Sequence, residues 1–280
     1  MQIFKQIAPL KAFLKGLKNA GKSVGLVPTM GALHDGHLAL IKASRHENEV
    51  TVSSIFVNPI QFNNQNDLLK YPRSLEKDTE LLEAAGCDAL FNPDDREMYP
   101  EKSTLSMDFG PLDKSMEGKF RPGHFSGVAL VVSKLFNIVG PDNAYFGQKD
   151  WQQFAIIRKL TEELNFQVRL HSIPTLREPD GLALSSRNLR LTARQRQRAS
   201  VFYQGLLQAR QALKEGKNLS EIRERITAAV EAYPDVKLEY LELVDSQNLN
   251  ALHNVGQSEH PIVCIAGYVG EIRLIDNMFV

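Results

Sequence analysis

The sequence has little cysteine, no excess charge of either sign and no long apolar run. Its two cysteines, Cys87 and Cys264, lack metal-ligand spacing and are too few for a disulfide framework, so we expect reduced, buried thiols. Lysine plus arginine equals aspartate plus glutamate, 33 of each, so no global field attracts a polyanion. This balance argues against nucleic acid as a partner.

Membrane-spanning patterns are also absent from the sequence. No stretch offers the roughly 18 consecutive apolar residues that a spanning helix needs. Lysine or proline interrupts every apolar run in residues 1–23, so these residues lack the apolar centre of a signal peptide. We therefore expect a cytoplasmic protein that has neither a membrane nor a nucleic acid as partner.

The first two thirds of the chain alternate short apolar runs with amphipathic stretches. We expect strands at 23–29, 49–57, 88–91, 143–147 and 166–174, and helices at 37–47, 74–86, 127–139 and 152–164. This alternation predicts an α/β fold, in which helices cover both faces of a Rossmann-like, mostly parallel sheet. Such sheets bind ligands beyond the carboxyl ends of their strands.

The character of the chain changes near residue 176. Charge-rich amphipathic helices are expected at 192–216 and 219–233, followed by strands at 236–246 and within 261–277. These elements predict a smaller C-terminal α+β domain that acts as a lid. We accordingly expect two domains, 1–175 and 176–280, with the binding site on the larger one.

Two histidines lie where a predicted strand runs into a helix, in PTMGALHDGHL (28–38). Gly31 and Gly36 leave room for a ligand to approach the backbone, and a helix start offers unpaired N–H groups that suit a phosphate. His34 and His37 are three residues apart and share one helix face. Each can donate a hydrogen bond to phosphate and, when protonated, offset charge on a leaving pyrophosphate.

Two other interpretations apply to such a pair, namely histidines that only cap or pack, and ligands of a zinc ion. The flanking glycines after a buried strand disfavour the first interpretation. Zinc-binding pairs usually lie four residues apart and have a third ligand, which is lacking nearby. HDGH instead resembles the HxGH signature of the nucleotidyltransferase superfamily, which implies ATP, adenylyl transfer and a Rossmann-like sheet.

Further polar side chains follow other predicted strands. FVNPIQF (56–62) places the neutral amides of Asn58 and Gln61 where ligand-facing loops begin. Such amides can bond a hydroxyl or a carboxylate without adding charge. Gly147 permits close approach of adenosine or phosphate, and Lys149 can serve as a point charge for phosphates.

The next polar residues extend this pattern toward the C-terminal domain. Asp150 can orient the neighbouring lysine or the ribose hydroxyls, and Gln153 offers a second amide to a small acid. Beyond the predicted linker, Ser185, Ser186 and Arg187 would grip the outer phosphates when the lid closes.

Together these segments closely resemble the pantothenate synthetase (pantoate–β-alanine ligase) family over essentially the whole chain. FVNPIQF, RPGHF followed by GVALVVSKLFNIVGPDNAYFGQKD, and GLALSSRN are far more specific than HDGH. The resemblance implies a homodimeric ligase of pantothenate and coenzyme A biosynthesis. It implies that (R)-pantoate condenses with β-alanine through a pantoyl adenylate, with ATP as co-substrate, Mg²⁺ as cofactor, and AMP and diphosphate as products.

Residue roles follow from the resemblance together with the chemistry of the side chains. The resemblance makes His37 the catalytic acid, and the phosphate-facing donors His34, Lys149 and Arg187 complete the catalytic set. The ATP contacts are Met30, Gly31, Ala32, Leu33, His34, Asp35, Gly36, His37, Gly147, Gln148, Lys149, Asp150, Leu176, Leu184, Ser185, Ser186 and Arg187. Pantoate would contact Asn58, Gln61 and Gln153, and Gln61 would also border β-alanine. Asp78 is the expected Mg²⁺ ligand.

Two other functions remain open from the sequence. Another HxGH nucleotidyltransferase would leave the nucleotide on its product, but Gln61 and Gln153 suit a small hydroxy acid better than a phosphorylated acceptor. A non-catalytic nucleotide-binding protein would not need Lys149, Arg187 and both histidines in register with the family pattern. A tRNA synthetase is disfavoured, because neither an anticodon-binding domain nor a net basic surface is apparent.

Overall fold

The five predicted apolar strands and one unpredicted edge strand form a six-stranded sheet in the computed structural model, which describes all residues from 1 to 280. The strands are β1 (Gln2–Phe4), β2 (Val24–Thr29), β3 (Val50–Ile55), β4 (Ala89–Phe91), β5 (Asn143–Gly147) and β6 (Arg169–Ile173). They pair in the order β1–β4–β3–β2–β5–β6, and every pair is parallel. All six residues of β3 are buried, as expected of a central strand covered on both faces.

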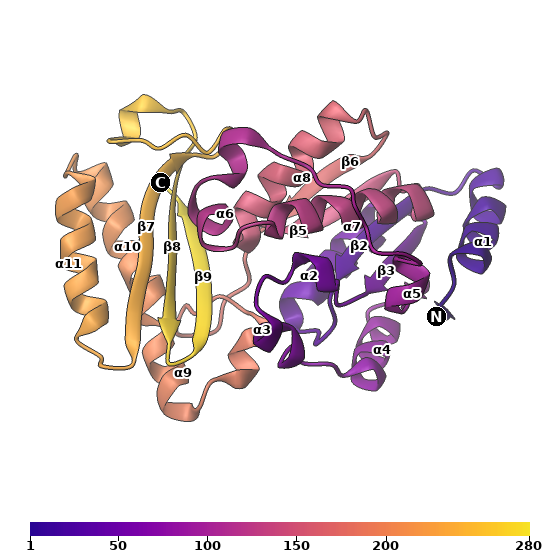
Figure 1. Ribbon diagram of the computed structural model, residues 1–280, viewed down its shortest axis with the longest axis horizontal. Helices are drawn as coiled ribbons and strands as arrows, with labels where there is room; N and C mark the ends of the chain where they lie inside the picture. Colours follow the sequence, from indigo (N-terminus) through magenta and orange to yellow (C-terminus); the bar gives the residue numbers. More distant parts are fainter.

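Helices cover both faces of this sheet (Figure 1). The helices on one face are α1 (Ile7–Asn19), α7 (His124–Val139) and α8 (Trp151–Glu163), and those on the other are α2 (Asp35–Glu47) and α4 (Leu75–Ala84). Alternate residues of β2 serve the two faces, because Leu26 packs in the core with α7 and α8 whereas Val27 packs in the core with α2. The predicted α/β fold is confirmed.

The strand order reverses beside β2. From β2 the sheet extends through β3 and β4 on one side and through β5 and β6 on the other. The connections that leave β2 and β5 therefore run to opposite faces, and a crevice forms between them at the carboxyl ends of the strands. The HDGH segment leaves β2, and residues 147–150 leave β5. The topology thus brings these two segments to one place.

The C-terminal third forms a second, antiparallel sheet. Its strands β7 (Val236–Asp245), β8 (Pro261–Val269) and β9 (Ile272–Phe279) pair in chain order, and α10 (Val201–Lys214) and α11 (Leu219–Glu231) cover its outer face (Figure 1). The single helix expected at 192–216 is two helices, α9 (Ala193–Ala199) and α10. At their junction the Ser200 hydroxyl donates to the Gln197 carbonyl, a local bond of the kind that competes with helix continuation.

The two sheets share part of one apolar core. Tyr240, Ile262 and Cys264 of the antiparallel sheet belong to the same buried cluster as Trp151 and Phe154 of α8. This shared packing means that the antiparallel sheet is anchored on the parallel one. The division into domains at residue 176 stays a prediction.

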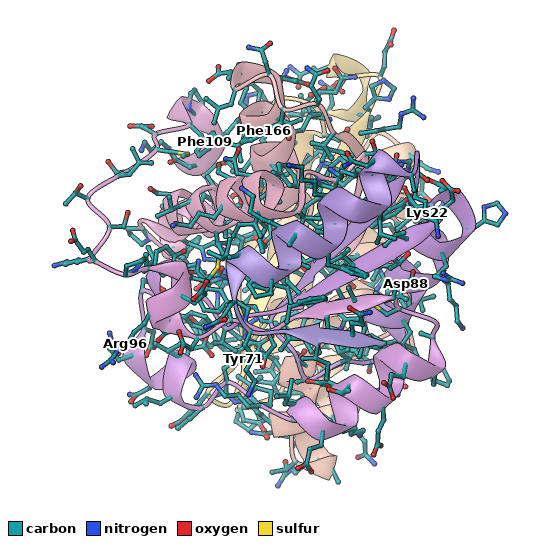
Figure 2. All side chains as sticks on the ribbon, turned by 90° about the vertical axis from the view of Figure 1, so that its right-hand side faces the viewer. Lys22, Tyr71, Asp88, Arg96, Phe109 and Phe166 are labelled. Atoms are coloured by element: carbon teal, nitrogen blue, oxygen red, sulfur yellow. The ribbon has the colours of Figure 1, made fainter.

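Sequence reasoning assigned no element to the first 22 residues, which form β1 and α1. Leu10 and Leu14 of α1 are one turn apart and buried, and Figure 2 shows this helix across the near side of the molecule, with Lys22 and Arg96 pointing outward. The remaining short elements are α3 (Gln65–Leu69), α5 (Asp95–Met98), α6 (Met116–Phe120), η1 (Pro59–Gln61), η2 (Gly110–Asp113), η3 (Gln148–Asp150), η4 (Ser186–Arg190) and η5 (Val255–Gln257). None of the helices combines the length and apolar character required to cross a membrane.

Candidate active site

A cavity of about 210 Å³ opens at the crevice beside β2 and β5. The predicted site residues that line it are Met30, His34, Gly36, His37, Asn58, Gln61, Gly147, Lys149, Asp150, Gln153, Leu176, Leu184, Ser185, Ser186 and Arg187. The predicted site residues that do not line it are Gly31, Ala32, Leu33, Asp35, Asp78 and Gln148. The fold therefore gathers most of the predicted site around one space.

The two histidines cap the amino end of α2. His34 is the N-cap residue, and its Nδ1 accepts a hydrogen bond from the backbone N–H of Gly36 at 3.2 Å. The Nδ1 of His37 reaches back to the backbone N–H of His34 at 3.3 Å, which completes a reciprocal cap. Their ring centroids are 4.1 Å apart, and both rings line the cavity. The two histidines therefore cap the helix and also face the cavity, so the two interpretations are compatible.

Both rings are neutral at physiological pH. Burial, followed by the charge of Lys149, lowers the pKa of His34 to about 4. Burial has the largest effect on His37, followed by electrostatic repulsion from His34 and Lys149, and together they lower its pKa to about 3. Because each Nδ1 accepts a backbone N–H, the ring proton lies on Nε2. In the substrate-free protein the pair therefore supplies neutral N–H donors and Lys149 supplies the cation, and the role of His37 as the acid stays a prediction.

A buried carboxylate shapes the loop between β2 and α2. The two oxygens of Asp78 each accept a backbone N–H at 2.8 Å, one from Ala32 and one from Leu33. Gly31 and Ala32 have φ of 83° and 51°, so successive N–H groups turn toward one anion. Asp78 is 1% exposed and does not line the cavity. Backbone N–H groups already occupy both oxygens of Asp78, so this carboxylate has a structural role in the loop, and its assignment as a magnesium ligand stays a prediction.

The side chain of Asn58 positions the amide of Gln61, and its own amide is used by bonds within the protein. Its Nδ2 donates to Gln61 Oε1 and to the Gly127 carbonyl, both at 3.1 Å, and its Oδ1 accepts from the Tyr99 hydroxyl at 2.9 Å. These bonds fix the orientation of the Gln61 amide. The Nε2 of Gln61 has only the weak acceptor Met30 Sδ, at 3.3 Å, so this N–H group is the one available to a ligand.

The turn η3 places a cation and two further polar groups at the cavity. Lys149 Nζ lies 3.7 Å from Asp150 Oδ2, and the side chain of Gln153 forms no hydrogen bond within the chain. The Nδ2 of Asn277, from β9, donates to the carbonyls of Gln148 and Lys149 at 2.9 and 2.8 Å. The antiparallel sheet thus fixes the backbone of η3. Sequence reasoning assigned no role to Asn277, because its partners are distant in the chain.

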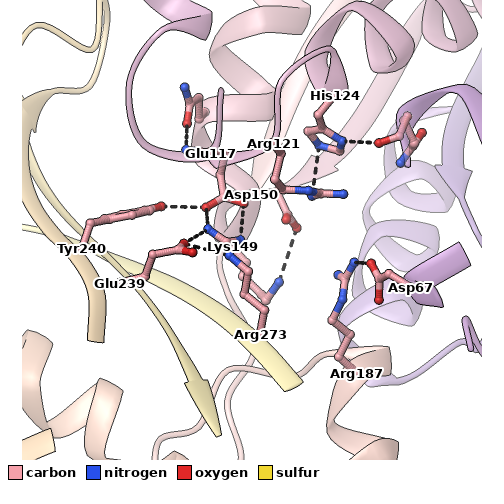
Figure 3. A network of polar contacts seen from close by, with 12 residues as sticks. Asp67, Glu117, Arg121, His124, Lys149, Asp150, Arg187, Glu239, Tyr240 and Arg273 are labelled. Atoms are coloured by element: carbon pink, nitrogen blue, oxygen red, sulfur yellow. Dashed lines mark hydrogen bonds and ion pairs between the residues drawn. The ribbon is translucent and has the colours of Figure 1, made fainter. Parts of the chain in front are cut away.

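The predicted phosphate-binding arginine is engaged by a carboxylate. Arg187 donates to one oxygen of Asp67 at 2.9 Å (Figure 3). Arg190 donates to the other oxygen at 3.0 Å. Burial opposes ionisation of Asp67, but the two arginines outweigh it and hold the pKa of this carboxyl below its ordinary value. Ser186 donates its hydroxyl to the Ala32 carbonyl at 3.1 Å, which ties this segment to the HDGH loop. Sequence reasoning did not identify Asp67.

One wall of the cavity is apolar and comes from α7. Its side chains are Val128, Val131, Val132 and Leu135, which the sequence places in a predicted helix and a family motif without a role in the site. The helix reaches the cavity because Gly127 packs directly on η1, where an added Cβ would lie 2.7 Å from the Gln61 Cα. The glycine before the apolar run GVALVV was the available sequence signal for this contact.

The fold and the site define an α/β enzyme of the HxGH type, with neutral histidine donors, a lysine and two amides at its switch point. The family model described as Pantoate-beta-alanine ligase matches residues 2–279. The chain is 49% identical over 278 residues to the pantothenate synthetase of Bacteroides fragilis, which covers 99% of this chain and 98% of that one. It is 47% identical over 275 residues to that of Cytophaga hutchinsonii, with 98% and 97% covered.

Solved structures agree with these relatives. The pantothenate synthetase of Thermus thermophilus superposes with a TM-score of 0.92, 43% identity and 99% of both chains covered. The pantoate-β-alanine ligase of Francisella tularensis, solved with Beta-gamma ATP and β-alanine, superposes with a TM-score of 0.85 and 38% identity, covering 100% of this chain and 97% of that one. The chain belongs to the pantoate–β-alanine ligase family.

Proposed function

We propose that this enzyme condenses (R)-pantoate with β-alanine through a pantoyl adenylate, using ATP and releasing AMP and diphosphate. The main support is that the ring donors of His34 and His37 and the free amides of Gln61 and Gln153 face the same cavity. One set suits phosphate and the other suits a small hydroxy acid. A relative solved with an ATP compound and β-alanine fits this assignment.

Pantoate fits the end of the cavity that combines amides with an apolar wall. Its two methyl groups would pack on Val128, Val131 and Val132 of α7, and its oxygens would accept from the Gln61 and Gln153 amides. Neutral donors orient a carboxylate without pairing it with a full charge. The carboxylate therefore keeps its nucleophilic character toward ATP.

ATP fits between the HDGH segment, η3 and η4. In the first step, a pantoate carboxylate oxygen attacks the α-phosphorus, the bond to the bridging oxygen breaks, and diphosphate leaves with the electron pair. The Nε2–H donors of His34 and His37 and the charge of Lys149 would stabilise the charge that grows on the phosphate oxygens. Arg187 would join them after exchanging Asp67 for a phosphate.

The second step forms the amide. The β-alanine nitrogen, after losing one proton, attacks the acyl carbon, the bond from that carbon to the AMP oxygen breaks, and the nitrogen releases a second proton. Both cysteine thiols are buried, and burial raises the pKa of Cys87 to about 11 and that of Cys264 further. These thiols are unsuited to nucleophilic catalysis, so we propose a reaction without a covalent enzyme intermediate.

Magnesium would accompany the phosphates of ATP. No group of three or more His, Cys, Asp or Glu side chains is arranged to hold a metal, but Mg²⁺ bound to a nucleotide commonly uses only one or two protein carboxylates. The carboxylate that lines the cavity is Asp150, and we propose it in place of Asp78. The ion would neutralise charge on the diphosphate leaving group.

We also propose that the enzyme is a homodimer and that it acts in the cytoplasm. The backbone of residues 101–106 forms no hydrogen bond within the chain, and this segment exposes Leu105 by 60%. A second copy could cover this segment.

Light scattering should give twice 31.4 kDa for the wild type, and Leu105→Glu should shift the mass toward the monomer. A wild-type monomer at micromolar concentration would contradict the dimer.

Pyrophosphate exchange tests the adenylate. With ATP and pantoate but without β-alanine, labelled diphosphate should enter ATP. His34→Ala and His37→Ala should each slow this exchange on the order of 10²–10³-fold, whereas His46→Ala, at an exposed position of α2, should not. Exchange that requires β-alanine, or histidine variants that are folded and retain the wild-type rate, would refute the proposed mechanism.

A further inference from the structure

One cation beside the site has no carboxylate partner. Arg121 follows α6 and lines a second, more polar cavity of about 390 Å³. This second cavity adjoins the first, because Lys149, Asp150 and Arg187 line both. Of its five N–H donors, the Arg121 guanidinium uses only Nη1, which lies 3.3 Å from His124 Nε2 (Figure 3).

The carboxylates around Arg121 all have other partners. Both oxygens of Glu117 accept from Arg273, at 2.6 and 2.7 Å. Both oxygens of Asp67 accept from arginines of η4, and Asp150 lies beside the preceding lysine. The remaining donors of Arg121 are therefore not used by the chain itself.

The surroundings of Arg121 are unfavourable to an isolated cation. Burial, followed by the charge of Arg187, lowers the pKa of Arg121 to about 10. The group is still charged at neutral pH, and the nearby charges of Glu117 and Asp67 only partly offset the desolvation cost that it carries. A ligand carboxylate would offset this cost through two parallel N–H···O bonds.

The imidazole ring of His124 links Arg121 to Gln61, which lies at the proposed reaction centre. The Nε2 of His124 faces Arg121, and its Nδ1 donates to the main-chain carbonyl of Gln61 at 2.8 Å. Burial and the neighbouring Arg121 lower the pKa of His124 to about 4, so the ring is neutral and can bridge in this way. The guanidinium is thereby held at a defined distance from Gln61, yet it does not line the first cavity.

We propose that Arg121 binds the carboxylate of the amine substrate, which reaches the acyl adenylate through the second cavity. This inference rests on the proposed function, in which an amino acid's nitrogen attacks the acyl carbon beside Gln61. An amino acid with its carboxylate on Arg121 would direct its other end toward that carbon. The second cavity has six basic and four acidic side chains in its lining, a balance that favours a carboxylate over a second cation.

Arg121→Gln separates this role from the adenylation step. The variant should raise the KM for β-alanine on the order of 10- to 100-fold, the range expected for a lost charge-assisted pair. Pyrophosphate exchange without β-alanine should stay within about twofold of the wild type. The wild type should prefer β-alanine to β-alaninamide, which lacks the carboxylate, and the variant should lose most of that preference.

Lys70→Gln is the matched control. Lys70 lines the same cavity but is 58% exposed and paired with Glu271 at 3.4 Å, so its loss should change neither the KM nor the preference by more than about twofold. Equal losses of exchange and amide formation in Arg121→Gln, or an unchanged preference, would overturn the proposal. Absence of exchange in the wild type would instead count against the adenylate mechanism.

A measurement on the wild type keeps the inference testable if Arg121→Gln does not fold. Propionate has the carboxylate without the amine, so it should inhibit competitively against β-alanine and leave pyrophosphate exchange unchanged. Propionamide should not inhibit at the same concentration. Equal inhibition by both compounds, or by neither, would show that the carboxylate is not recognised.

Discussion

At the scale of single residues, burial decides what the site histidines can do. Their spacing puts them on one face of α2, but the cap that they form directs each Nδ1 to a backbone N–H and leaves Nε2–H for a ligand. Their low pKa values keep them neutral. An arrangement of this kind can donate to phosphate without attracting a second anion in place of substrate.

The lowered pKa of His37 makes a prediction for stability. The unfolded chain binds a proton on this residue below about pH 6.5, whereas the folded chain does not until about pH 3. The unfolded state therefore binds more protons in this window, and the free energy of unfolding falls as the pH falls from 6.5 toward 3. His37→Gln should reduce this slope by up to about 1.4 kcal/mol per pH unit.

Urea unfolding at several pH values between 4.5 and 7.5 measures this slope. His46→Gln is the control, because His46 is solvent exposed and should leave the slope unchanged. The assignment of a neutral, half-buried His37 fails if both variants show the wild-type slope.

Asp78 illustrates a carboxylate whose role is structural. Asp78→Ala should lower the free energy of unfolding on the order of 3 kcal/mol, because two buried N–H groups of the HDGH loop lose their acceptor. Glu80→Ala, on an exposed position of the same helix, should change it by less than about 0.5 kcal/mol. A normally stable Asp78→Ala enzyme that needs more Mg²⁺ would restore Asp78 as the metal ligand.

At the scale of elements, the close packing of α7 on η1 positions the amide of Gln61. Gly127 allows this approach, and Asn58 bonds across the same contact. The helix thus contributes both an apolar wall to the cavity and the support of its principal amide. A change at this contact should affect pantoate more than ATP.

Gly127→Ala tests this coupling between packing and binding. The added methyl group would lie 2.7 Å from a backbone atom, so α7 and η1 must separate, at a cost of about 1–3 kcal/mol in unfolding free energy. The KM for pantoate should rise more than the KM for ATP. Gly16→Ala in α1 has open space around its Cβ and should be neutral or stabilising. An equal rise in both KM values would argue against this role of η1.

At the scale of the whole molecule, the second sheet is part of the site's support. The Trp151 indole donates to the Ser246 carbonyl at 2.9 Å, and its ring packs edge-on against Phe279, 5.0 Å between centroids. Asn277 clamps the backbone of η3. The shared core would have to break if the whole second sheet moved as a lid. A lid motion that leaves this core intact is therefore limited to short segments such as η4 and its flanking loops.

Unfolding should accordingly be a single transition. Trp151, the only tryptophan, reports on the junction between the sheets, and far-UV circular dichroism reports on both. The two signals should coincide in urea. Tyr240→Phe, which removes a 2.9 Å bond to Glu117, should shift both midpoints down together. A fluorescence change at lower urea, without loss of secondary structure, would show that the sheets separate independently.

Much of the fold and part of the site were predictable from the sequence. Apolar runs of the right length indicate β2, β3 and β5, and the alternation with amphipathic helices determines a parallel sheet. The strand order, which brings the segments after β2 and β5 together at the switch point, came only from the tertiary structure. The family motifs, from HDGH to ALSSRN, then indicate which residues belong to the site.

Only the tertiary structure decided which of those side chains are free to act. The chain alone determined that His34 and His37 lie together on one helix face at the end of a strand, because helix spacing is a local property of the sequence. It could not show that burial keeps both rings neutral, that backbone N–H groups occupy the oxygens of Asp78, or that Arg121 contacts a histidine and no carboxylate. Desolvation and hydrogen-bond partnership depend on residues far apart in the chain, and those become neighbours only when the protein folds.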